Sequence, residues 1–201
     1  MKILSKILGI IGLVILSAGQ AFSASEEASA EFSFYLPEYL HIRPITSPVL
    51  TANITNRTGD LHAPLNTRFR VTSNAKEKRT LYLKANVVTS GGYEEAIFEQ
   101  GGQVYIAFAS LRRIPSSSAL HNCKAGGEPK DSPGIVAYPV TNISGAEHKF
   151  IKGKNKYEVY VGNGTTDIDV NIGAHVLKNS FAGNDPHGFY QAVLSLTESD
   201  I

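Results

Sequence analysis

His121, Asn122 and Cys123 place an imidazole and a thiol two residues apart, the first combination in this chain that could do chemistry. A histidine within hydrogen-bond reach of a cysteine can activate the thiol as a nucleophile, and both side chains are zinc ligands. A nucleophile pair also needs a group that orients the base, and a zinc site needs further ligands at suitable spacing. The neighbouring sequence offers neither, so we favour a polar loop with a dispensable thiol over a site based on Cys123.

Asp167, Asp169 and Asn171 alternate with apolar residues, as at the start of a calcium-binding loop. That loop requires glycine at its sixth position and glutamate at its twelfth, where this chain has Ile172 and Lys178. The apolar residues lie two apart, which is the period of a β-strand with one buried face. We therefore expect a strand with solvent-facing carboxylates, and neither a metal ion nor a cofactor.

Most motifs that would indicate an enzyme or a nucleic-acid-binding protein are missing from the sequence. It has no Gly-x-Ser-x-Gly, no phosphate-binding or dinucleotide-binding loop and no His-Glu-x-x-His. The formal net charge of +1 gives no support for binding nucleic acid or an anionic membrane. We therefore expect a protein that is not an enzyme.

Asn-x-Ser/Thr sequons, which matter only in a eukaryote, occur at Asn53, Asn56, Asn142 and Asn163.

The N-terminus has the features of a secretory signal peptide. Lys2 and Lys6 precede an apolar run at 7–18, and small residues follow at Ala21 and Ser23. The run is shorter than the roughly 20 residues that a membrane span needs. We expect cleavage after Ser23 and export of one domain at 24–201, with no membrane span, to the periplasm, the cell surface or the medium.

The rest of the chain has the rhythm of an all-β protein. Short runs of alternating apolar and polar residues are separated by Gly, Pro and Asn, and no segment keeps a 3.6-residue period for three turns. Residues 93–100 are compatible with either a strand or a helical turn, and 69–88 with a hairpin. The expected strands cover 30–36, 40–45, 49–54, 69–72, 81–88, 104–109, 135–140, 157–161, 166–172 and 185–197.

The stretch near the C-terminus has the most regular alternation. Tyr190, Leu194 and Leu196 share one face and should point into the core, whereas Gln191 and Ser195 share the other. Such a strand needs partners from earlier in the chain, because a lone strand cannot satisfy its own backbone. We therefore expect a sandwich of antiparallel sheets that this strand completes.

One segment, 112–134, lacks the alternation. It contains a run of serines, three prolines and a pair of glycines. A connection of this length without regular structure is usually functional or disordered. We expect a surface loop that could bind a ligand, with these candidate binding residues: Arg112, Arg113, His121 and Lys124.

Three pieces of the chain carry a resemblance to a known group. They are the alternating residues 30–36, the Val71-Thr72-Ser73-Asn74 turn that leads into 81–88, and the closing Gly188-x-Tyr190-x-Ala192-x-Leu194 strand. These pieces resemble secreted bacterial immunoglobulin-like sandwiches, in particular the pilin-like group that includes the spore-coat-U type of surface protein. The resemblance implies an all-β fold, an antiparallel Ig-like β-sandwich, and a non-enzymatic surface function.

Two functions remain open, and each predicts a different partner. A structural or adhesive surface subunit would bind copies of itself or other subunits, with the strand at 30–36 completing a neighbour's sheet. A monomeric binding module would recognise a glycan or a protein through 112–134. An exported enzyme that uses Cys123 is a distant third hypothesis.

Overall fold

The computed structural model describes residues 31–46, 64–124, 134–173 and 188–199. The chain divides into two compact units, Met1–Leu36 and Pro37–Ile201. Of the first unit, only 31–36 are described, and they form no helix or strand. The second unit contains every described strand and the one described helix, α2 (Ser117–Lys124).

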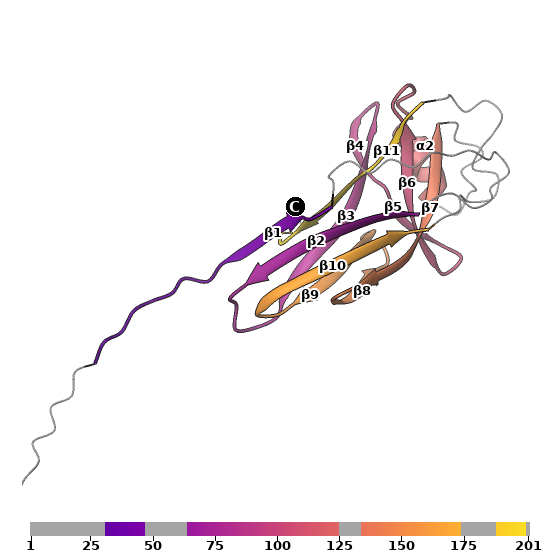
Figure 1. Cartoon of the computed structure of the whole chain (residues 1–201). Helices are drawn as coiled ribbons and strands as arrows, with labels where there is room; N and C mark the ends of the chain where they lie inside the picture. The colour runs from indigo at the N-terminus through magenta and orange to yellow at the C-terminus, as the bar shows by residue number, and fades with distance from the viewer. Residues whose placement is uncertain (1–30, 47–63, 125–133, 174–187, 200–201) are drawn as a thin grey trace, which may run out of the picture. The chain divides into compact units, whose positions relative to one another are not determined.

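The described part of the second unit forms two antiparallel sheets, of seven and five strands (Figure 1). In the first sheet the order is β1-β2-β10-β7-β6-β11, and β5 also pairs with β6. The strands are β1 (Leu40–Pro44), β2 (Leu65–Ser73), β5 (Ile97–Gln100), β6 (Gln103–Ser110), β7 (Ile135–Ser144), β10 (Gly164–Ile172) and β11 (Tyr190–Gln191).

The second sheet has the order β12-β3-β9-β8, and β4 also pairs with β3. Its strands are β3 (Arg79–Thr89), β4 (Gly92–Glu95), β8 (Glu147–Ile151), β9 (Lys156–Val161) and β12 (Val193–Thr197). Every strand pair formed by the described residues is antiparallel. The expected all-β, antiparallel sandwich is therefore confirmed.

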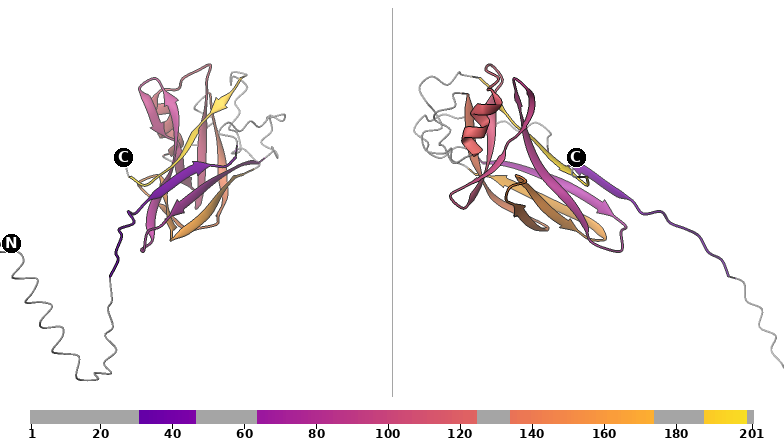
Figure 2. Two further views of the ribbon diagram at one scale, coloured as in Figure 1. Left: turned by 60° about the vertical axis from the view of Figure 1, so that its left-hand side comes forward. Right: turned by 180° about the vertical axis from the view of Figure 1, so that it is seen from behind.

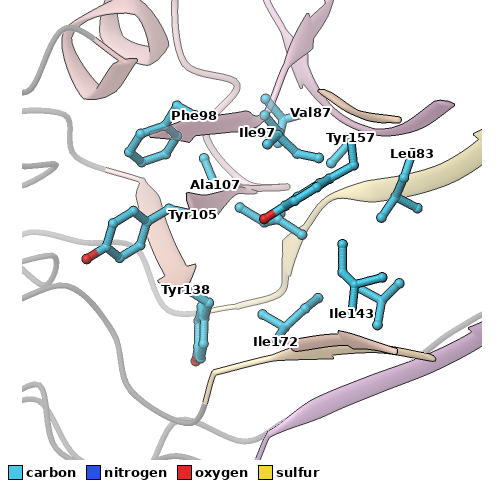
Figure 3. Close-up of a cluster of buried hydrophobic side chains, with 14 of the residues drawn as sticks. Leu83, Val87, Ile97, Phe98, Tyr105, Ala107, Tyr138, Ile143, Tyr157 and Ile172 are labelled. Carbon is cyan, nitrogen blue, oxygen red and sulfur yellow. The ribbon is translucent and has the colours of Figure 1, made fainter. Parts of the chain in front are cut away.

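The core lies between the inner faces of the two sheets (Figure 3). In β3, alternate side chains are buried, from Leu81 to Val87, while Tyr82 and Lys84 between them are half-buried. In β10, Ile168 and Val170 are buried, as the alternation predicts. Strand β6 is covered on both faces over much of its length, as its continuous apolar run indicates.

The predicted hairpin at 69–88 is wrong. Strands β2 and β3 exist near the predicted places, but β2 pairs with β1 and β10, whereas β3 pairs with β4, β9 and β12. The turn between them carries the chain from one sheet to the other, and Ala75 within it is buried. The alternation of apolar and polar side chains identifies a strand but not the strands with which it pairs. Either sheet of the sandwich could bury the same apolar face.

The predicted strand at 30–36 is also not observed. Its described residues, 31–36, are extended chain without a partner strand among the described residues. Phe32 and Phe34, which alternate in the expected strand, are 92% and 93% exposed. The residues alternate as expected, but neither of the two described sheets includes them.

The closing strand splits in two. Tyr190 and Gln191 pair with β6 in the first sheet, and Val193 begins β12, which pairs with β3 in the second. Parity is retained, since Leu196 is buried, Tyr190 and Leu194 are half-buried and Gln191 is exposed. Ser195 is half-buried rather than fully outside.

The segment 112–134 is not structureless throughout, because it contains α2. Leu120 and Cys123 of this helix are fully buried, whereas its residues His121 and Asn122 are exposed. The expectation that Cys123 lies in a polar loop is therefore wrong. The helix is difficult to recognise in the sequence, because serines and prolines surround it. Its apolar residues extend over only about one and a half turns, which is too short for a clear helical period.

Several expectations fall outside the described residues. These are the signal peptide at 1–23, the strand at 49–54, and the sequons at Asn53 and Asn56. Asn142 lies exposed in β7, and Asn163 lies exposed before β10. Strand β8 was not predicted, because its sequence, Glu147–Ile151, is mostly polar and follows β7 closely.

Candidate functional site

The predicted cysteine–histidine pair does not form. Cys123 is fully buried and His121 is exposed. Side chains two positions apart in a helix do not share a face, so α2 itself separates them. Among the described residues, no three His, Cys, Asp or Glu side chains come together as a metal site would require.

The predicted binding residues are only partly brought together. Arg112 and Arg113 follow β6 and are exposed, and the side chain of Arg112 lies against Gly188. His121 is exposed on α2, and Lys124 is the last residue of that helix. The apolar pocket lined by 86–88, 109–111, Ile114 and 191–193 includes none of these four positions.

The carboxylates of β10 have a structural role. Asp167 accepts two hydrogen bonds from Arg70 of β2, at 2.7 and 2.8 Å, and Asp169 is paired with Arg68 in the same way. The hydrogen bonds from Arg70 hold the pKa of Asp167 below its ordinary value. These pairs cross the outer face of the first sheet, which excludes the calcium-loop interpretation.

The strongest functional feature is the segment 31–36. Phe32, Phe34 and Leu36 lie two residues apart and are 92%, 93% and 68% exposed. Soluble proteins expose single apolar side chains routinely, but three in alternation on an extended chain form an apolar stripe. Such a stripe matches one face of a strand and would be buried by pairing with a sheet edge.

The second unit offers such an edge in β12. Among the described residues β12 pairs on one side only, with β3, and it carries neither a charge nor a proline. The opposite edge of the same sheet, β8, carries Glu147, His148 and Lys149. Charged residues are a common means of preventing an edge from pairing with another chain. By this criterion β8 is protected and β12 is open.

Strand β1 is the nearby edge of the first sheet. Arg79 forms ion pairs with Glu38, before β1, and with Glu198, after β12, at 2.7 and 2.8 Å. The two edges are therefore fixed next to each other at one end of the sandwich. Figures 1 and 2 show the end of the yellow strand β12 beside the indigo strand β1.

Apolar side chains along these two edges are incompletely covered. Leu40 and Ile42 of β1 and Leu194 of β12 pack against the core but are only partly buried. The sequence marks these residues as apolar and alternating. It does not reveal that their strands end the two sheets, since that depends on strand order.

Comparisons with models of protein families, with curated proteins and with solved structures each found no match. Within the described residues, no helix combines the length and the apolar character that crossing a membrane requires.

Proposed function

We propose that this protein is an exported, non-enzymatic surface subunit, structural or adhesive, that assembles by strand addition. The segment 31–36 of one copy adds to the free edge of β12 in the next. One observation carries the proposal: the exposed alternation of Phe32, Phe34 and Leu36 on a segment that pairs with no strand among the described residues. The proposal agrees with the sequence resemblance to pilin-like surface proteins.

The energetics of such an addition are favourable. Full burial of one large apolar side chain contributes about 1.5–3 kcal/mol, so three would contribute several kcal/mol before the cost of ordering the segment. Main-chain hydrogen bonds with β12 would add affinity that does not depend on side-chain identity. The added side chains would also cover the exposed part of Leu194.

The proposal is tested with the chain that lacks 1–23. Phe34→Asp places a charge on the apolar stripe and is expected to raise the dissociation constant for self-association at least about 100-fold, the scale of a lost interface anchor. Size-exclusion chromatography with light scattering over a range of protein concentrations measures this change.

Ser33→Asp is the matched control, because it introduces the same charge one residue away, on the other side of the extended segment. It is expected to leave self-association within about threefold of the unchanged chain. A chain that remains monomeric at every concentration, or equal effects of the two substitutions, would refute assembly by strand addition.

The second candidate function is recognition of a glycan or a protein by the surface around 112–134. It is favoured by the exposure of Arg112, Arg113 and His121 beside a helix that is anchored through Leu120. A rigid scaffold that presents exposed polar residues is typical of binding modules. A strictly monomeric protein would favour this second candidate over the first.

A further inference from the structure

An apolar pocket lies at the end of the sandwich where the chain crosses from β11 to β12. Its volume is about 90 Å³, and it is lined by residues 86–88 of β3, by 109–111 at the end of β6, by Ile114, and by 191–193. The crossing opens it, because β11 pairs with Ala109 and Ser110 while β12 begins opposite Asn86 of the other sheet. The ends of β3 and β6 both line the pocket beneath this crossing.

The rim of this pocket is apolar and exposed. Leu111, Ile114 and Val193 are 53%, 52% and 46% exposed, and Val88 beside them is also exposed. The rim is held in place by backbone hydrogen bonds, from Leu111 to Phe189 at 2.9 Å and from Ser90 to Pro115 at 3.0 Å. A contiguous apolar patch on a fixed backbone is typical of an interaction surface.

The pocket continues the open edge of β12, since Val193 belongs to both. A strand that adds to this edge therefore reaches the pocket at one of its own ends. Six residues of extended chain span about 20 Å, and the five residues of β12 span about 17 Å. The segment 31–36 is thus just long enough to run from Thr197 to the pocket.

The direction of addition decides which end of the segment arrives there. Every strand pair formed by the described residues is antiparallel, and antiparallel pairs are slightly more stable per residue than parallel ones. Antiparallel addition to β12 that puts Phe34 opposite Leu194 brings Leu36 opposite Ala192, which lines the pocket, and leaves Glu31 opposite Thr197. Leu36 is apolar and 68% exposed, which suits the pocket.

We propose that this pocket is a second contact between copies of the chain: it receives Leu36 of the copy whose segment 31–36 has added to β12. This inference rests on the proposed function and specifies its direction. The chain that continues after Leu36 then emerges at the pocket end, so that successive copies join end to end.

Cysteine cross-linking between two variants tests the direction. One chain carries Leu36→Cys and the other carries Ile114→Cys, and the two are mixed and oxidised. The single native cysteine, Cys123, is fully buried and forms no disulfide, so it contributes little background. We expect a cross-linked heterodimer from this pair and at least about tenfold less from the matched pair Glu31→Cys with Ile114→Cys.

A second measurement tests the rim of the pocket by substitution, without cross-linking. Ile114→Asp should raise the dissociation constant for self-association at least about tenfold, while Thr165→Asp, on the exposed outer face of β10, should leave it within about threefold. Both positions are exposed, so neither substitution should prevent folding.

The outcomes separate this inference from the proposed function. If Glu31→Cys cross-links and Leu36→Cys does not, addition is parallel and the inference is overturned while strand addition stands. If neither cross-links and Ile114→Asp assembles normally, the pocket is not part of the junction. If Phe34→Asp has no effect on self-association, the proposed function itself fails.

Discussion

At the scale of single residues, the burial of Cys123 points to a role in packing and not in catalysis. Cys123 is 0% exposed within α2, as is Leu120 one turn earlier, and the chain has no second cysteine. A buried cysteine of this kind behaves as a small apolar residue. Its contribution is therefore to packing.

Cys123→Ser should lower the free energy of unfolding by about 1–3 kcal/mol, because the hydroxyl group must be buried in an apolar site. The neighbouring Asn122→Ala, at an exposed position of the same helix, should change it by no more than about 0.5 kcal/mol. Urea unfolding of both variants measures the difference. Equal stability of the two would mean that the helix does not bury this thiol.

At the scale of elements, the closing strand shows that the facing of side chains can be predicted from the sequence, whereas the sheet that each half of the strand joins cannot. Side-chain parity follows from the backbone period of two, so the faces of Leu196 and Gln191 could be predicted from the sequence. The change of sheet at Ala192 could not, since each half alternates in the same way. The same limit explains the wrong hairpin at 69–88.

The candidate site shows the same division. The alternation of Phe32, Phe34 and Leu36 is visible in the sequence, but it is equally compatible with a strand of the chain's own sheet. Only the strand order shows that the described sheets do not include this segment and that β12 has a free edge. The apolar pocket was not predictable, because it is assembled from three stretches that are distant in sequence.

Leu196→Ala should cost about 2–5 kcal/mol of stability, because it leaves a cavity where β12 meets the core. Gln191→Ala, one residue before the crossing and exposed, should cost no more than about 0.5 kcal/mol. Urea denaturation of each variant, at a concentration where the protein is monomeric, gives both values. Comparable losses would contradict the observed facing of the two side chains.

At the scale of the whole molecule, the division into two units separates folding from assembly. The core that stabilises the sandwich is drawn from the second unit, Pro37–Ile201, whereas the apolar stripe belongs to the first. A chain that begins at Pro37 should therefore fold on the same core and unfold at nearly the same temperature when monomeric. It should also be unable to donate a strand while keeping its free β12 edge.

A synthetic peptide that covers 26–37 can then replace the missing segment. A ligand that binds only the folded state stabilises it by RT ln(1 + [L]/Kd), about 2.7 kcal/mol at one hundred times the dissociation constant. We expect the peptide to raise the unfolding temperature of the shortened chain by several degrees. The same peptide with Phe32 and Phe34 replaced by serine should have no such effect. Stabilisation by both peptides, or by neither, would contradict recognition through the apolar stripe.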